Sequence, residues 1–427
     1  MVYRPEMRVL VVGSGGREHA LVSKIAKSPL VDQLYCAPGN PGTARLAENA
    51  PLAAEDVSGL ARFARDRGID LAVVGPEAPL VAGLADRLAE GGIAVFGPSA
   101  AAARLEGSKA FAKEVMEAAG IPTASHRVFE SFPEASAHAR AQGGRVVVKA
   151  DGLASGKGVV VCSSPEEAEA ALRGLLLERV HGEAGRRVVV EERLEGPEAS
   201  VIALTDGERL LVLPPAQDHK RVFDGDRGPN TGGMGAFSPT PHVDAGLLAE
   251  LERSVFRPVL REMARRGSPF RGALYAGLML TRQGPKVLEF NARFGDPETQ
   301  PILLRLSSDL VPALLGAARG QLEGVALAFD RRAAVGVVLA AEGYPGAVAK
   351  GDVIEGAEGP FGEGVEVFQG GTARAPDGSL RTAGGRVLTV CALGEGLEAA
   401  AARAYQAASA VRFRGCHYRR DIGRSHG

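Results

Sequence analysis

Residues 145–164, RVVVKADGLASGKGVVVCSS, carry the most information about the fold of this chain. Their central loop, GLASGKG from Gly152 to Gly158, resembles a phosphate-binding P-loop. A P-loop has four residues between its first glycine and its Gly-Lys pair, followed by a Ser or Thr that holds magnesium. Here three residues intervene, and Gly158 stands where the hydroxyl is required. The loop is therefore not a P-loop.

The sequence on either side of this loop predicts another role. RVVVKA precedes it and GVVVCSS follows it, and both runs are typical of β-strands, so the loop joins two strands of a hairpin. Its glycines let the backbone fold over an anion, and Lys157 adds a mobile positive charge. Lys149, at the end of the first strand, is placed to reach the same phosphates. We expect a lid that closes over a nucleotide; a flexible glycine-rich turn is the alternative.

Residues 186–200, RRVVVEERLEGPEAS, follow the lid with an apolar strand that ends in paired glutamates. Gly-Pro and a further glutamate come next. Two interpretations remain open from these residues alone. One is a solvated edge strand, and the other is a hinge whose backbone binds adenine while Glu198 lies near the ribose hydroxyls.

A third element, KVLEFNARFGDPETQP at residues 286–301, indicates a metal site. Glu289 and Asn291 are two apart on a predicted strand, so their side chains share one face. Both offer hard oxygen ligands, and one or two such groups plus substrate phosphates suit magnesium. Arg293 and Asp296 follow where the strand ends. A buried Glu289–Arg293 ion pair would explain the glutamate but not the asparagine, so we favour the metal.

The bulk composition excludes several classes of protein. The chain has 427 residues, with 45% hydrophobic and 24% charged, which is ordinary for a globular protein of about three domains. A net charge of −1 argues against nucleic acid or a membrane surface as partner. The four cysteines form no CxxC pair, and neither a signal peptide nor a long apolar run is evident. We expect a soluble, cytoplasmic protein with free thiols.

Residues 8–104 alternate between predicted strands and helices, which indicates a parallel sheet with helices on both faces. The turn from Gly13 to Glu18 lacks the third glycine of a dinucleotide-binding fingerprint. The second strand also ends without the acidic residue that an NAD site needs. We therefore predict no NAD site. The turn still offers backbone N–H groups at a helix start, beside Arg17, which suits a phosphate or a carboxylate.

The rest of the chain falls into three further patterns. A helix over 108–120 and a compact α/β stretch to about residue 190 come first. Residues 187–300 are rich in strands, with one long helix at about 245–266. From about 333 an antiparallel tract ends in the strand GGRVLTVCAL and a helix.

A lid hairpin, a glutamate-rich hinge and an E-x-N strand, in this order, resemble the ATP-grasp fold. Within that fold the chain resembles the glycinamide ribonucleotide synthetase family, also called phosphoribosylamine–glycine ligases, nearly from end to end. The similar signatures are VVGSGGREHAL, PGNPGT, VVGPEAPL, LPPAQDHKR, NTGGMGAFSP and EFNARFGDPETQP.

The resemblance implies an α/β chain of three domains. These are a Rossmann-like parallel-sheet domain at 1–104, an ATP-grasp domain at 105–326 with its lid at about 122–190, and a mixed α/β domain at 327–427. It also implies a carbon–nitrogen ligase of purine biosynthesis. ATP phosphorylates glycine to glycyl phosphate, and 5-phosphoribosylamine then attacks the acyl carbon and releases phosphate. Mg²⁺ or Mn²⁺ and the lysines neutralise the anionic substrates.

The family's site residues are carried over to the matching positions of this sequence. Those for the ATP phosphates are Lys109, Lys149, Ser155, Gly156, Lys157 and Gly158. Those for the adenine and ribose are Glu191, Glu192, Leu194 and Glu198. Those for the metal are Glu289 and Asn291, and catalytic roles go to Arg293, Lys157 and Asp218.

The second substrate is placed by similarity to the formate-using transformylase of the same pathway. Its residues are Gly16, Arg17, Glu77 and Asp296 around the ribosylamine, with Arg386 on the 5′-phosphate. Asp218, His219 and Lys220 form either a solvated turn or a wall that binds glycine or the amine. We expect a monomer, with transient contact to the preceding amidotransferase because phosphoribosylamine is labile.

One departure concerns the metal. Many ATP-grasp enzymes carry an acidic ligand on the preceding strand, but here that strand is GALYAGLMLT, residues 272–281. A second metal ion therefore needs another ligand or water. The rival interpretations are a different ATP-grasp ligase and a non-catalytic ATP-binding sensor.

Overall fold

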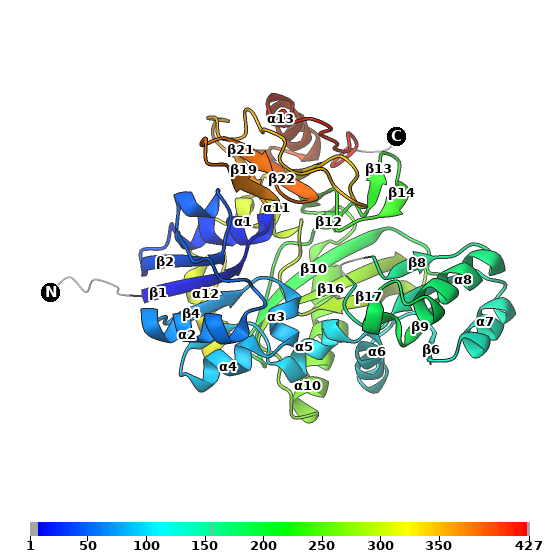
Figure 1. The fold of residues 1–427 in the computed structure, drawn as a ribbon. Helices are drawn as coiled ribbons and strands as arrows, with labels where there is room; N and C mark the ends of the chain where they lie inside the picture. The colour runs from blue at the N-terminus through cyan, green and yellow to red at the C-terminus, as the bar shows by residue number, and fades with distance from the viewer. Residues whose placement is uncertain (1–6, 155–156, 425–427) are drawn as a thin grey trace.

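The structure, a computed structural model, describes residues 7–154 and 157–424. The blue amino-terminal sheet and the orange-red carboxy-terminal sheet lie one above the other, and the green lid projects to one side (Figure 1). Across the described part of the chain, none of the helices combines the length and the apolar character that a membrane crossing requires.

The amino-terminal parallel sheet is confirmed. Its five strands run in the order β3-β2-β1-β4-β5, and all four neighbouring pairs are parallel. Alternate residues of its central strand β1 (Met7–Gly13) enter different cores, Val9 on one face and Leu10 on the other, so helices cover both faces. The other strands are β2 (Val31–Pro38), the unpredicted two-residue β3 (Glu48–Asn49), β4 (Leu71–Val74) and β5 (Ala94–Phe96). The helices are α1 (Gly16–Ile25), α2 (Val57–Arg67), α3 (Glu77–Val81), α4 (Leu84–Glu90) and α5 (Ala100–Gly107), with a 3₁₀ turn at Thr43–Arg45.

The predicted lid hairpin is also confirmed. Strands β7 (Val146–Ala150) and β8 (Val159–Val161) are antiparallel, with Val147 opposite Val161. They belong to a four-stranded sheet in the order β6-β9-β7-β8, whose apolar face packs on two helices. The remaining elements of this region are α6 (Lys109–Ala118), β6 (His126–Phe129), α7 (Phe132–Ala141), α8 (Pro165–Leu172), a π-helical turn (Arg173–Leu177), a 3₁₀ turn (Gly182–Gly185) and β9 (Val188–Glu192).

The central sheet has the order β11-β10-β16-β17 and is antiparallel throughout. Its strands are β10 (Glu198–Thr205), β11 (Leu210–Val212), β16 (Gly272–Thr281) and β17 (Gly284–Asn291). The helix predicted at about 245–266 is present as α9 (Ala245–Leu251), a π-helical turn (Glu252–Phe256) and α10 (Arg257–Arg265). Helices α11 (Thr299–Arg305) and α12 (Val311–Arg319) follow.

The carboxy-terminal sheet draws strands from two distant parts of the chain. Its order is β12-β15-β18-β22-β19. The last three are β18 (Ala333–Ala340), β19 (Val365–Gln369) and β22 (Arg386–Gly394), whereas β12 (Gln217–Asp218) and β15 (Gly235–Ser238) precede residue 326. The sheet therefore crosses the expected boundary between the second and third domains, and the domain limits stay a prediction. The other elements here are the hairpin β13 (Arg221–Phe223) and β14 (Arg227–Asn230), the hairpin β20 (Thr372–Arg374) and β21 (Leu380–Thr382), and α13 (Leu397–Ala410).

Candidate active site

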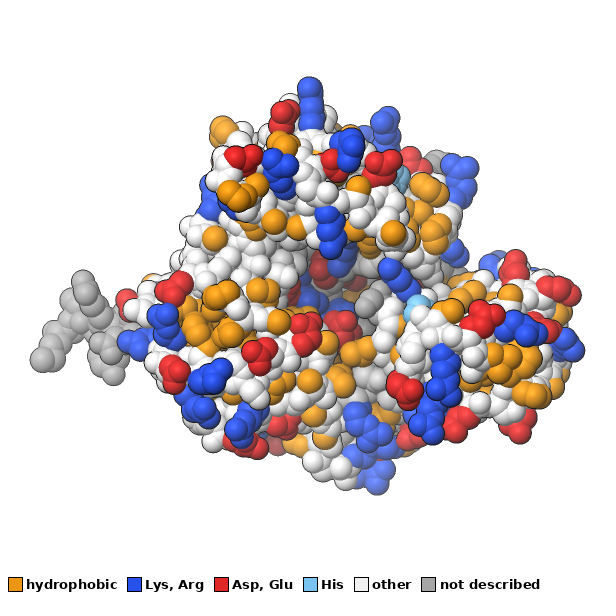
Figure 2. Space-filling model, in the orientation of Figure 1, with side chains coloured by type: hydrophobic (Ala, Val, Ile, Leu, Met, Phe, Trp, Pro, Cys, Tyr) orange, Lys and Arg blue, Asp and Glu red, His pale blue; other side chains and the backbone are white. Residues whose placement is uncertain are grey.

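A hollow opens between the carboxy-terminal lobe, the lid and the amino-terminal lobe, and charged side chains gather inside it (Figure 2). Most of the residues that the sequence pointed to come from elements around this hollow. They lie on α1, α3, α6, β7, the loop after β12, β17 and the start of β22.

The two expected metal ligands share one face of β17, as predicted. Glu289 and Asn291 are half-buried, whereas Phe290 between them points into the core. On the neighbouring strand Glu289 faces Gly277, where a Cβ atom would lie 3.4 Å from the Cγ of the glutamate. The glycine thus leaves room beside the carboxylate.

Lysines surround the carboxylate of Glu289. Burial by itself raises the pKa of this group, but the positive charges of Lys220, Lys149 and Lys109 outweigh it and hold the pKa below its usual value. Among residues 7–154 and 157–424, no group of three His, Cys, Asp or Glu side chains is placed to hold a metal ion. Two hard oxygen donors therefore fit a magnesium ion that takes its other ligands from phosphates and water.

The hinge glutamates are not on a solvated edge. Strand β9 lies between β6 and β7, and Glu191 is only 2% exposed. Its carboxylate pairs with Lys149 at 2.9 Å and with Lys113 at 3.0 Å. The edge-strand interpretation is therefore wrong. Glu192 accepts a hydrogen bond from the Ser125 backbone N–H at 2.9 Å and pairs with Lys286 at 3.2 Å.

The lid lysines are connected to the core. Lys149 Nζ donates to the Leu288 carbonyl at 3.0 Å, on β17 and next to Glu289. Lys109 Nζ donates to the Gly152 carbonyl at 3.4 Å, at the start of the lid loop. Lys157 is exposed. Ser155 and Gly156, which were also assigned to the phosphates, lie outside the described residues.

The segment Asp218–Lys220 is not a solvated turn. Asp218 belongs to β12, the edge strand of the carboxy-terminal sheet next to β15, and all three residues are half-buried. Lys220 pairs with Glu198, the expected ribose residue, at 2.9 Å. Burial raises the pKa of Asp218 to about 7; Lys220 opposes this rise, and the nearby carboxylates of Glu298 and Glu198 add to it.

Arg293 does not pair with Glu289, the expected metal ligand, although such a pair was the alternative explanation of that strand. Its guanidinium lies instead between Glu77 at 3.3 Å and Glu106 at 2.9 Å. Burial by itself raises the pKa of Glu77, but Arg293 and then Arg17 lower it below its usual value. This cluster joins α3 and α5 to the end of the metal strand.

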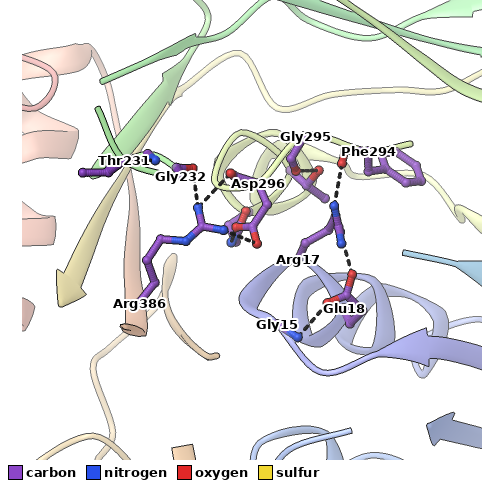
Figure 3. A network of polar contacts seen from close by, with 12 residues as sticks. Gly15, Arg17, Glu18, Thr231, Gly232, Phe294, Gly295, Asp296 and Arg386 are labelled. Carbon is purple, nitrogen blue, oxygen red and sulfur yellow. Dashed lines mark hydrogen bonds and ion pairs between the residues drawn. The ribbon is translucent and has the colours of Figure 1, made fainter. Parts of the chain in front are cut away.

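Three of the residues expected around the ribosylamine, Arg17, Asp296 and Arg386, belong to the network of polar contacts in Figure 3. Arg17 reaches from α1 to the Phe294 carbonyl at 3.1 Å and pairs with Glu18 at 2.5 Å. Arg386 pairs with Asp296 at 2.9 Å and donates to the Gly232 carbonyl at 2.6 Å.

Beside this network lies a cavity of about 70 Å³. Its lining joins the start of α1, the loop after β17 and the start of β22: Gly15, Gly16, Asp296, Gly370, Gly371, Arg386, Leu388 and Thr389. With its side chain 26% exposed, Arg386 is not a free surface arginine. The structure therefore brings together three of the five residues expected for the ribosylamine at one cavity and places Arg17 next to it.

Several buried charged residues of the site were not predicted, among them Lys113 and Glu106. Lys113 is 2% exposed, and Glu106 accepts a hydrogen bond from the Ala292 N–H at 2.7 Å. Lys113 had a usable signal, because it lies four residues after Lys109 and so shares its helix face. No local sequence pattern indicated Glu106, because its partners Ala292 and Arg293 lie far away along the chain.

Three family models match the chain: the N domain of phosphoribosylglycinamide synthetase over residues 7–106, its ATP-grasp (A) domain over 107–299 and its C domain over 334–425. Among curated relatives, the phosphoribosylamine–glycine ligase of Pseudomonas aeruginosa is 52% identical over 420 residues, which is 98% of this chain and 97% of the relative. The enzyme of the same name from Vibrio vulnificus is 50% identical over 98% of both chains.

Solved structures agree with the family models. The crystal structure of phosphoribosylamine–glycine ligase from Thermotoga maritima superposes with a TM-score of 0.85 at 37% identity, and covers 97% of this chain and 100% of that one. The biotin carboxylase domain of Hydrogenobacter thermophilus 2-oxoglutarate carboxylase has a TM-score of 0.73 at 20% identity over 97% and 92% of the two chains, which supports the fold alone. The chain therefore belongs to the phosphoribosylglycinamide synthetase family.

Proposed function

We propose that this chain uses ATP to join glycine to 5-phosphoribosylamine through glycyl phosphate, which gives glycinamide ribonucleotide, ADP and phosphate. One observation carries the proposal. A carboxylate that lysines surround, Glu289 with Lys149 nearby, and a second polar cavity at Asp296 and Arg386 are built on one segment, because Asp296 lies seven residues after Glu289. The relatives named phosphoribosylamine–glycine ligase support the same reaction.

In the first step a carboxylate oxygen of glycine attacks the γ-phosphorus of ATP, and ADP leaves. Both reacting groups, the glycine carboxylate and the triphosphate of ATP, are anionic, so their approach needs positive charge that is already in place. We assign this charge to Lys109, Lys149 and Lys157. Glu289 and Asn291 would hold Mg²⁺ or Mn²⁺, which when bound neutralises the phosphate oxygens.

In the second step the amine of phosphoribosylamine attacks the acyl carbon of glycyl phosphate. A C–N bond forms, the C–O bond to phosphate breaks, and the amine loses one proton. Asp218 suits the role of proton acceptor, because a pKa of about 7 matches the pH at which the proton must be taken up and released. Lys220 and Glu198 fix the wall on which Asp218 stands.

The ribosylamine is assigned to the cavity beside α1. Arg386 would meet the 5′-phosphate, together with the backbone N–H groups at the start of α1 near Gly16. Asp296, Glu77 and Arg17 would surround the ribose and its amine. Arg293, which Glu77 and Glu106 hold in place, would stabilise the charge on the transferring phosphoryl group.

The adenine is assigned to the hinge after β9. From Glu191 to Leu194 the chain leaves β9, passes the exposed Arg193 and is half-buried again at Leu194, and its backbone groups there would meet the base edge. Glu198 would bind the ribose hydroxyls. We further propose a cytoplasmic monomer that meets the amidotransferase supplying phosphoribosylamine only transiently.

Production of ADP tests this function. ADP should form only when ATP, glycine and freshly made phosphoribosylamine are all present, together with stoichiometric glycinamide ribonucleotide. ADP formation with bicarbonate or formate in place of glycine would identify another ATP-grasp ligase. Binding of ATP without turnover under every substrate combination would identify a sensor.

A further inference from the structure

The hairpin β13–β14 stands at the edge of the candidate site, and both of its ends belong to that site. Lys220, which pairs with Glu198, immediately precedes the hairpin. Thr231 immediately follows it, and its N–H and Oγ1 donate to the Lys220 carbonyl at 2.7 and 2.8 Å. Gly232 comes next and accepts from Arg386. Any displacement of the hairpin is therefore passed to Lys220 and Gly232.

The base of the hairpin is held by a fully buried arginine near the other end of the sequence. Arg419 is 0% exposed, and its Nη1 donates to the Arg221 carbonyl at 3.1 Å and to Asp226 Oδ1 at 2.7 Å. Its Nε and Nη2 donate to the two carboxylate oxygens of Asp421 at 2.7 and 2.6 Å. A guanidinium removed from water is costly unless it is paired in this way.

The tip of the hairpin is tied to the same segment. The turn Asp224–Asp226 has left-handed backbone at Gly225 and Asp226. The Gly225 N–H donates to Asp421 Oδ2 at 2.9 Å, and the Arg420 N–H donates to Asp224 Oδ1 at 2.7 Å. Figure 1 shows the carboxy-terminal end of the chain beside β13 and β14.

The first strand of the hairpin, β13, is also held by a histidine. Nε2 of His417 lies 2.8 Å from the Val222 carbonyl. Residues 417–421 thus contact the first strand and the turn of a hairpin that lies about two hundred positions earlier in the sequence. Hydrogen bonds with charged groups at several points on one hairpin fix its position as well as its fold.

We propose that Arg419 is a positioning residue for the ligase reaction, which acts through the hairpin on the wall formed by Asp218–Lys220 and Gly232. This inference rests on the proposed function, since it needs that wall to bind glycine or the ribosylamine. In the part of the chain that the structure describes, the hydrogen bonds and ion pairs of the Arg419 side chain go to Arg221, Asp226 and Asp421 and none goes to the lid strands β7 and β8.

The test compares Arg419→Met with Arg414→Met. Arg414 lies in the same terminal stretch, but it is exposed and pairs with Asp352 instead of the hairpin. In Arg419→Met the KM of glycine or phosphoribosylamine should rise at least tenfold, while the KM of ATP should rise by a smaller factor, because the Lys220–Glu198 pair connects the hairpin to the residue assigned to the ribose of ATP and not to those assigned to its phosphates. Arg414→Met should behave as the wild type. Arg419→Lys should fall between the two, because an ammonium cannot match both carboxylates as a guanidinium does.

Amide hydrogen exchange, read by mass spectrometry without substrates, tests the contact itself. Exchange of the backbone amides of residues 221–232 should increase in Arg419→Met, whereas residues 146–150 of the lid should keep the wild-type rate. The Asp226 side chain is 65% exposed, so Asp226→Asn removes the negative charge of the partner on the hairpin without opening the core and should show the same pattern more weakly.

Three results would overturn the inference. One is faster exchange in the hairpin with all KM values unchanged. Another is an equal rise of all three KM values, which would mark general loosening of the fold. The third is wild-type exchange and kinetics in both Arg419→Met and Asp226→Asn. A wild-type chain that makes no ADP from the three substrates would instead reject the proposed function, and the exchange data would remain valid.

Discussion

The ammonium group of Lys149 lies 2.9 Å from the carboxylate of Glu191, and that carboxylate also holds Lys113 at 3.0 Å. A lysine assigned to the ATP phosphates is thus balanced by a carboxylate whose charge is shared with a second lysine. Burial, only partly offset by Glu191, lowers the pKa of Lys113 to about 8. The buried trio links α6 to two strands of the lid sheet.

Lys113→Met should weaken the use of ATP. Without Lys113, Glu191 attracts Lys149 alone and draws it away from the phosphates. We expect the KM of ATP to rise about tenfold, equivalent to roughly 1.4 kcal/mol, with the KM of phosphoribosylamine unchanged. Lys27→Met, at an exposed lysine that pairs with Glu366, is the matched control. An unchanged ATP KM in Lys113→Met would show that Lys149 is positioned without this trio.

The raised pKa of Asp218 predicts a pH dependence of the second step. If Asp218 accepts the amine proton, kcat/KM for phosphoribosylamine should rise with pH through an apparent pKa near 7. Asp218→Asn should lower kcat and remove this limb from the profile. A profile that keeps the limb in the variant would assign the proton to another group.

The same carboxyl predicts a stability change with a definite sign. Its pKa of about 7 in the folded chain lies above the ordinary value of 3.8. The folded state therefore binds the extra proton between these values, and the free energy of unfolding falls as pH rises through that window. Urea unfolding should show Asp218→Asn gaining stability relative to the wild type between pH 5 and pH 8. If the free energies of unfolding of the variant and the wild type differ by the same amount at pH 5 and at pH 8, the raised pKa of Asp218 is contradicted.

The metal assignment predicts that Glu289→Gln combined with Asn291→Ala abolishes Mg²⁺-dependent turnover while the thermal unfolding temperature stays near that of the wild type. Binding of Mn²⁺ in the presence of ADP, followed by electron paramagnetic resonance, should weaken in parallel. Gln283→Ala, in the exposed turn before the same strand, is the control. Near-normal rates at limiting Mg²⁺ in the double variant would contradict the assignment of Glu289 and Asn291 as metal ligands.

The lid assignment predicts that Lys157→Ala raises the KM of ATP and slows phosphoryl transfer. Lys157 is exposed on the lid loop and is assigned only to phosphates, so the KM of phosphoribosylamine should not change. Arg179→Ala, elsewhere on the lid, controls for loss of surface charge. A tenfold rise in the KM of phosphoribosylamine with normal ATP kinetics would show that the loop binds phosphoribosylamine instead of ATP.

Local patterns in the sequence predicted the elements whose signals are local. The lid hairpin followed from two apolar runs around a glycine loop, and the shared face of Glu289 and Asn291 followed from the period of a strand. The parallel sheet followed from the alternation of strands and helices.

Long-range pairings had no such signal. The two-residue strand β12 joins the carboxy-terminal sheet through β15, and nothing in its own sequence specifies that partner. Arg293 forms an ion pair with Glu77, which lies more than two hundred positions away in the sequence, and Arg419 pairs with Asp226 at a similar separation. Such pairs depend on tertiary packing, which single-sequence periodicity does not encode.

The geometry around Arg386 gives the final prediction. The guanidinium donates to the Gly232 and Asp296 carbonyls at 2.6 and 2.8 Å and pairs with the Asp296 carboxylate, so it is oriented before any substrate arrives. A phosphate that meets it should gain roughly 1.5–3 kcal/mol. Arg386→Ala should therefore raise the KM of phosphoribosylamine about tenfold to a hundredfold and leave the constants of ATP and glycine nearly unchanged.

Arg386 also holds Gly232, and loss of that contact would by itself change the KM of phosphoribosylamine. The contact with the phosphate therefore needs a separate measurement. Ribose 5-phosphate should compete with phosphoribosylamine in the wild type, and its inhibition constant should rise by the same factor in Arg386→Ala. Arg381→Ala removes an arginine of the same lobe that pairs with Asp377, and it should change neither constant. If ribose 5-phosphate inhibits Arg386→Ala as strongly as the wild type, the 5′-phosphate binds elsewhere and Arg386 serves only to hold Gly232 and Asp296 together.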